Sequence, residues 1–74
     1  DTDDSLSLIK SLIKELNLDK KRFAPRAVKS VISSAKNELI GPGEYQALAN
    51  SYYQREVTKI YQQYQDKLAQ SQAV

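Results

Sequence analysis

Residues 42–70, PGEYQALANSYYQREVTKIYQQYQDKLAQ, decide the fold that this sequence predicts. After the first turn the stretch contains no proline or glycine, and apolar residues and tyrosines recur at three- and four-residue spacing: Tyr45, Leu48, Ala49, Tyr52, Tyr53, Val57, Ile60, Tyr61, Tyr64 and Leu68. This spacing predicts one long helix over residues 42–70. At a rise of about 1.5 Å per residue, such a helix would extend roughly 43 Å.

Two shorter amphipathic helices are predicted before it, over residues 3–16 and 25–38. One apolar stripe marks the first of them: Leu8, Ile9, Leu12, Ile13 and Leu16. The second carries its own stripe: Val28, Val31, Ile32, Ala35 and Leu39. The predicted fold class is therefore all-α, with the two shorter helices packed on the long one in a single helical unit over residues 1–74.

Several residues are typical of the ends of these helices. Thr2, Asp3 and Asp4 would cap the start of the first helix, and Asn17 would end it. Pro25 suits the first position of the second helix, because that position needs no backbone N–H. Between the two helices, Leu18 and Phe23 are the predicted core anchors of the connecting segment.

The five tyrosines all lie in residues 42–70. We predict that Tyr45, Tyr52 and Tyr61 belong to the core, where a ring is buried and its hydroxyl reaches the wet edge. Tyr53 and Tyr64 have two open interpretations. They would either fill the core or form an exposed edge, and an exposed edge would stack on single-stranded bases or bind another protein.

Composition excludes most kinds of catalytic site. The chain has no cysteine and no histidine, which excludes disulfides, thiolate and imidazole metal sites, and cysteine or Ser-His nucleophiles. Its two glycines, Gly41 and Gly43, are not followed by Lys-Ser or Lys-Thr, so a Walker-type phosphate loop is absent as well. The opening DTDD lacks the glycine and glutamate of a calcium loop. We expect no catalytic residue, metal or cofactor in this chain, and a soluble, cytoplasmic protein.

Charge is segregated along the chain although the net charge is only +2. Residues 20–36 contain six lysines and arginines and no acid, whereas the segments on either side carry a net negative charge. This asymmetry makes anion binding worth testing. An ordinary solvated face is an equally good interpretation of the charge alone.

A row of polar side chains lies along the second predicted helix at three- and four-residue spacing: Arg26, Lys29, Ser33, Lys36 and Asn37. Residues so spaced share one face of a helix. No acid interrupts the row, and such donors suit the phosphates of a nucleic-acid backbone. The alternative is that Lys36 only interacts favourably with the negative, C-terminal end of the helix dipole.

Longer motifs resemble one family over almost the whole chain. They are DTDDSLSLIKSLIKELNLD (1–19), FAPRAV (23–28), ISSAKNELI (32–40) followed by PGEY (42–45), and YYQREVTKIYQQYQDKL (52–68). Together they resemble subdomain 1B of the UvrD/Rep/PcrA-type superfamily I DNA helicases. The most specific element is IS-x-AKN-x-L over residues 32–39.

This resemblance implies an all-helical subdomain inserted into the first motor domain of a helicase. Such a subdomain would help to hold DNA at the junction of single strand and duplex while the motor domains hydrolyse ATP with Mg²⁺. Lys36 matches a lysine associated with duplex contact, and Asn37 and Ser33 are its neighbours in the motif. The expected partners are DNA and the remaining helicase domains, and the expected state is a monomer that is no enzyme by itself.

One departure from the family pattern and one alternative function remain. The sequence has Gly41 and Gly43 where the family usually has a serine, threonine or aspartate and a glutamate, which predicts a looser start for the third helix. A function of a different class is also open. In that alternative the chain is a helical protein-interaction module that uses its tyrosine-rich face.

Overall fold

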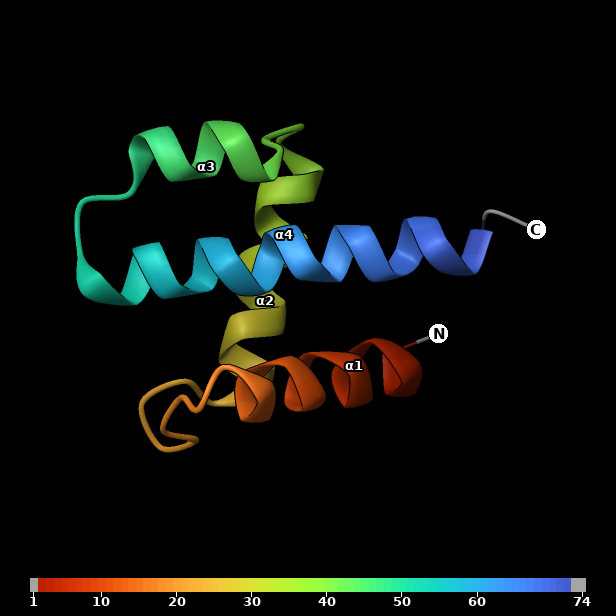
Figure 1. Ribbon diagram of the computed structural model, residues 1–74. Helices are drawn as coiled ribbons and strands as arrows, with labels where there is room; N and C mark the ends of the chain where they lie inside the picture. Colours follow the sequence, from red (N-terminus) through yellow and green to blue (C-terminus); the bar gives the residue numbers. More distant parts are fainter. Residues whose placement is uncertain (1, 73–74) are drawn as a thin grey trace.

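The computed structural model describes residues 2–72, and four α-helices account for most of them (Figure 1). They are α1 (Thr2–Glu15), α2 (Pro25–Asn37), α3 (Pro42–Leu48) and α4 (Tyr52–Gln72). No strand occurs in this part of the chain, and the predicted all-α class is confirmed. The side chains of Thr2, Asp3 and Asp4 lie outside those that are described, so the predicted cap stays a prediction.

α1 and α4 run antiparallel, and α2 crosses them (Figure 1). The core lies where these three helices meet. Its buried members come from both predicted short helices, from the connector and from the last helix: Ile9, Leu12, Ile13, Phe23, Val28, Ile32, Ala35, Val57, Ile60, Tyr61 and Tyr64. The predicted anchors are confirmed, because Phe23 is only 1 % exposed and Leu18 packs against the core.

The prediction of a single long helix over residues 42–70 is wrong. Residues 49–51 are not helical, so α3 ends at Leu48 and α4 begins at Tyr52. The Ser51 hydroxyl accepts a hydrogen bond from the Gln54 backbone N–H at 3.2 Å. The Gln54 side-chain oxygen in turn accepts one from the Asn50 backbone N–H at 2.8 Å. Ser-x-x-Gln is the signature of a capping box, although here the Gln54 side chain reaches back to the N–H of Asn50, the residue before the cap. Such a cap begins a helix without any glycine or proline.

The break lets α3 fold back along the first half of α4 (Figure 1). Tyr45 of α3 meets the Tyr61 ring edge-to-face, with 6.4 Å between the ring centroids. The Tyr61 hydroxyl also donates a hydrogen bond of 2.7 Å to the Ile40 carbonyl, just before α3. Tyr61 therefore anchors both the entry to α3 and its packing on α4.

α1 and α2 end in the same way, at a residue with a left-handed backbone. Asn17 has φ 57° and Leu39 has φ 60°. At each end the next residue's N–H bonds back across the last turn, Leu18 to Ile13 at 3.0 Å and Ile40 to Ala35 at 2.8 Å. This is the Schellman arrangement, for which glycine and then asparagine are the preferred residues. The predicted stop at Asn17 is confirmed.

Leu39 does not belong to the apolar stripe in which the sequence places it. α2 ends at Asn37, one residue earlier than predicted, and the left-handed turn directs the Leu39 side chain outward, where it is 87 % exposed. Ile40 packs against the core instead.

The tyrosines divide differently from the prediction. Tyr61 is buried as predicted, and Tyr45 is half-buried. Tyr64, for which the sequence allows either interpretation, is also buried, and Tyr53 stacks flat on Phe23 with 5.1 Å between ring centroids. Tyr52 is 49 % exposed and is not a core residue, because it opens α4 at the edge of the fold while Phe23 fills the interior beside it.

Candidate nucleic-acid interface

α2 has one apolar and one polar face. Pro25 occupies its first turn, and Val28, Ile32 and Ala35 are buried against the core. Because a helix repeats every 3.6 residues, this places the predicted polar row on the opposite side. No acidic residue lies in the first turn of α2.

Three of the five predicted site residues line one shallow hollow. Arg26, Lys29 and Ser33 surround a volume of about 370 Å³ on the surface of α2. Arg26 and Ser33 are exposed, and Lys29 is half-buried. Their charged and hydroxyl groups can reach an anion that lies along this face.

Leu6 and Ser30 complete the hollow, and the sequence interpretation missed both. Ser30 follows Arg26 by four residues and precedes Ser33 by three, so the same helical spacing could have included it. Leu6 comes from α1 and reaches the hollow only because α1 packs against α2. No pattern within residues 25–38 could have indicated it.

Lys36 and Asn37 lie outside this hollow, at the other end of the polar face. Both are exposed. The Lys36 ammonium lies over the Tyr64 ring, 5.6 Å from its centroid, and the Tyr64 hydroxyl donates a 3.1 Å hydrogen bond to the Ser5 hydroxyl. Lys36 thus leans toward α4 and α1, and a cation–π contact of this exposed kind contributes only about 0.5–1 kcal/mol.

No acid whose side chain the structure describes forms an ion pair with a cation of α2. Among the described residues the one salt bridge joins Lys59 and Glu56 of α4, at 2.9 Å. Glu38, the acid that follows α2 in the sequence, is exposed and forms no such pair. The α2 face therefore carries positive charge that no described acid neutralises.

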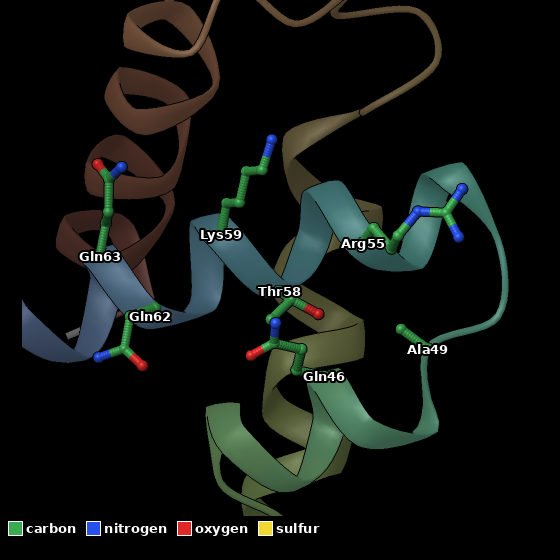
Figure 2. A pocket seen from close by; sticks show the side chains of 7 residues that line it. All are labelled: Gln46, Ala49, Arg55, Thr58, Lys59, Gln62 and Gln63. Atoms are coloured by element: carbon green, nitrogen blue, oxygen red, sulfur yellow. The ribbon is translucent and has the colours of Figure 1, made fainter.

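A larger hollow of about 530 Å³ lies between α3 and α4 (Figure 2). Gln46 and Thr58 point toward each other across it, whereas Lys59 and Gln63 project away from them. The Thr58 hydroxyl already donates to the Gln54 carbonyl at 2.8 Å. The polar groups that line this hollow do not converge on one point, so it is a weaker candidate for a binding site than the α2 face.

Two further features are absent from the described residues. No cluster of His, Cys, Asp or Glu in that range could hold a metal ion. No helix in the same range is both long enough and apolar enough to cross a bilayer.

Comparison with known proteins gives the family. The model of the UvrD/REP helicase N-terminal domain matches residues 1–74. Over the same 74 residues the chain is 49 % identical to the ATP-dependent DNA helicase PcrA of Bacillus subtilis (strain 168), 38 % to that of Leuconostoc citreum and 39 % to that of Staphylococcus epidermidis. These matches cover all of this chain but only 10 % of each relative. No solved structure matches it. The chain belongs to the UvrD/REP helicase N-terminal domain family.

Proposed function

We propose that this chain is subdomain 1B of a UvrD/Rep/PcrA-type helicase and contacts DNA through the polar face of α2. The observation that carries the proposal is the face itself: Arg26, Lys29 and Ser33 share one hollow, and Lys36 and Asn37 extend the row to the end of the helix. The family match supports DNA as the partner. The proposed contact is with the phosphate backbone at the junction of single strand and duplex.

The dimensions of α2 suit this role. Arg26 and Lys36 are ten residues apart, which corresponds to about 15 Å along a helix. One DNA strand presents a phosphate about every 3.4 Å of helix axis, so the row faces roughly four phosphates. Lysine and arginine supply the charge, and Ser33 and Asn37 supply hydrogen-bond donors that hold the register.

The arrangement of the chain ends supports an insertion into a larger motor domain. Because α1 and α4 are antiparallel, α1 begins and α4 ends on the same side of the fold (Figure 1). A unit inserted into another domain needs its two ends close together. We propose that residues 1–74 form such a unit and that other segments of the parent protein bind ATP and Mg²⁺ and hydrolyse the nucleotide.

The alternative of a tyrosine-rich docking face has less support. Tyr64 is buried and Tyr53 is stacked on Phe23, so neither tyrosine presents a free ring. A partner protein that used either of these two rings would have to displace core packing, and Tyr52 is the one tyrosine whose ring is exposed. We therefore favour DNA over a protein partner.

Titration of the ¹⁵N-labelled chain with forked DNA, following each backbone amide, tests the proposal. We expect the largest shift changes over residues 26–37, and smaller changes over α3. Shift changes confined to α4, or no change at low salt, would contradict it. Adding salt to the complex should reverse the changes, since phosphate contacts weaken as counterions compete.

A further inference from the structure

The turn between α1 and α2 presents three consecutive cations on an ordered backbone. Lys20, Lys21 and Arg22 are all exposed. Asp19 fixes the turn: its side-chain oxygen accepts a hydrogen bond from the Lys21 N–H at 2.9 Å, and its carbonyl accepts from the Phe23 N–H at 2.8 Å. The three side chains therefore leave a defined turn and not a loose loop.

An aromatic cluster supports this turn. Phe23 is buried, and its ring stacks on Tyr53 with an interplanar angle of 5°. Tyr52 meets Phe23 edge-to-face, with 5.9 Å between the centroids. Arg22 lies over the Tyr52 ring, its guanidinium carbon 5.4 Å from the centroid. Buried Phe23 thus positions the exposed Tyr52 and Arg22 next to each other.

Among the described residues, Tyr52 and Arg22 are themselves neither buried in the core nor joined to an acid by an ion pair. Tyr52 is 49 % exposed, and its hydroxyl makes no hydrogen bond among the described residues. Within the same range the turn cations form no salt bridge: Asp19 bonds the backbone of the turn, and Glu56, one turn after Tyr52, pairs with Lys59. Charge and an open aromatic surface remain available side by side.

We propose that the turn 19–24 and Tyr52 form a second DNA contact, which binds unpaired bases of a single strand. A base would stack on Tyr52 or on the Arg22 guanidinium above it, and Lys20 and Lys21 would neutralise adjacent phosphates. Aromatic rings beside cations are the usual basis of sequence-independent single-strand binding. The inference rests on the proposed function in one respect, that the chain works on DNA, but the residues differ from those of the α2 face.

The test measures the affinity of the chain for fluorescent oligo-dT and for a blunt duplex in parallel, by anisotropy across a salt series. Tyr52→Leu should weaken oligo-dT binding about 5- to 150-fold, the range that stacking on one ring supports. Tyr52→Phe, which keeps the ring, should bind like the wild type. Binding of the blunt duplex should not change in either variant.

A charge variant covers the case in which Tyr52→Leu loses its fold. Lys20→Gln with Lys21→Gln leaves the aromatic cluster intact and should reduce the salt slope for oligo-dT by about 1.4, since each single-strand phosphate contact contributes about 0.7. The matched control is Lys59→Gln with Lys67→Gln on α4, which removes the same charge; Lys67 lies roughly 22 Å beyond Tyr52 along the helix.

Two results would overturn the inference. One is unchanged oligo-dT affinity in folded Tyr52→Leu or in the Lys20, Lys21 variant. The other is an equal loss for oligo-dT and duplex in both the site variant and the control, which would indicate only net charge. Loss of duplex binding in an α2 variant is a separate outcome and concerns the proposed function alone.

Discussion

Tyr61 joins α4 to the entry of α3 through one buried hydroxyl, which donates to the Ile40 carbonyl. Tyr61→Phe removes that donor and leaves the carbonyl without its partner, so we expect a loss of about 1 kcal/mol in the free energy of unfolding. Urea titration measures it. Tyr52→Phe is the matched control, because the Tyr52 hydroxyl makes no hydrogen bond among the described residues. Equal stability of both variants and the wild type would contradict the role of this bond.

The same tyrosine makes stability depend on pH at the alkaline end. Burial raises the pKa of Tyr61, and burial together with the charge of nearby Tyr53 raises the pKa of Tyr45. A raised folded-state pKa means that the folded state holds the proton more tightly than the unfolded state. The stabilisation is complete below the unfolded pKa of about 10 and is lost as pH rises through the folded values. In Tyr61→Phe, the free energy of unfolding measured by urea titration should therefore fall less steeply as the pH rises through this range.

Leu39 has a left-handed backbone conformation, which leucine rarely adopts. A left-handed conformation costs an L-residue about 1–2 kcal/mol, and glycine avoids this cost. Because the side chain is 87 % exposed, Leu39→Gly loses little packing. Glycine also raises the entropy of the unfolded chain, which offsets part of this benefit. We therefore expect a net gain of about 0.5–1 kcal/mol in the free energy of unfolding. Thermal unfolding measures it, and a destabilised variant would show that Leu39 makes contacts that its exposure does not indicate.

At the scale of elements, the break between α3 and α4 depends on the cap at Ser51. Ser51→Ala removes the acceptor for the Gln54 N–H and should cost about 1 kcal/mol. A further consequence distinguishes a cap from a simple surface contact: the amide of Gln54 should exchange faster with solvent. Unchanged exchange at Gln54 would contradict the capping box.

The helices themselves were readable from sequence because apolar spacing fixes which face is buried. The stripes of α1 and α2 lie in the core or pack against it as predicted, apart from Leu39. The long helix failed for a local reason, since Ser51 and Gln54 begin a new helix with residues that do not forbid the old one. A search for capping boxes would have found the break.

The candidate site could be predicted only in part. Spacing along α2 placed Arg26, Lys29 and Ser33 on one face, and the structure brings them to one hollow. Leu6 joins them from α1, and Tyr64 of α4 lies beneath Lys36. Both depend on how helices pack, which the pattern within one helix does not encode.

At the scale of the whole molecule, α2 has apolar residues in the core and polar residues on the opposite face. Helices α1, α2 and α4 bury one core, and α2 crosses the other two (Figure 1). The polar residues Arg26, Ser33, Lys36 and Asn37 of α2 are exposed. Lys36 is exposed at one end of this face, and Arg26 is exposed near the other. A rigid helix that carries cations at both ends suits a backbone contact better than an isolated flexible loop would.

The affinity of Lys36→Ala for forked DNA across a salt series tests this account most directly. Lys59→Ala, which removes one exposed lysine from α4, is the control. If Lys36 contacts a phosphate, its loss should weaken binding and lower the slope of log K against log salt by about one, while the control keeps the wild-type slope. Wild-type affinity and slope in Lys36→Ala, or the same change in both variants, would contradict a DNA contact at Lys36.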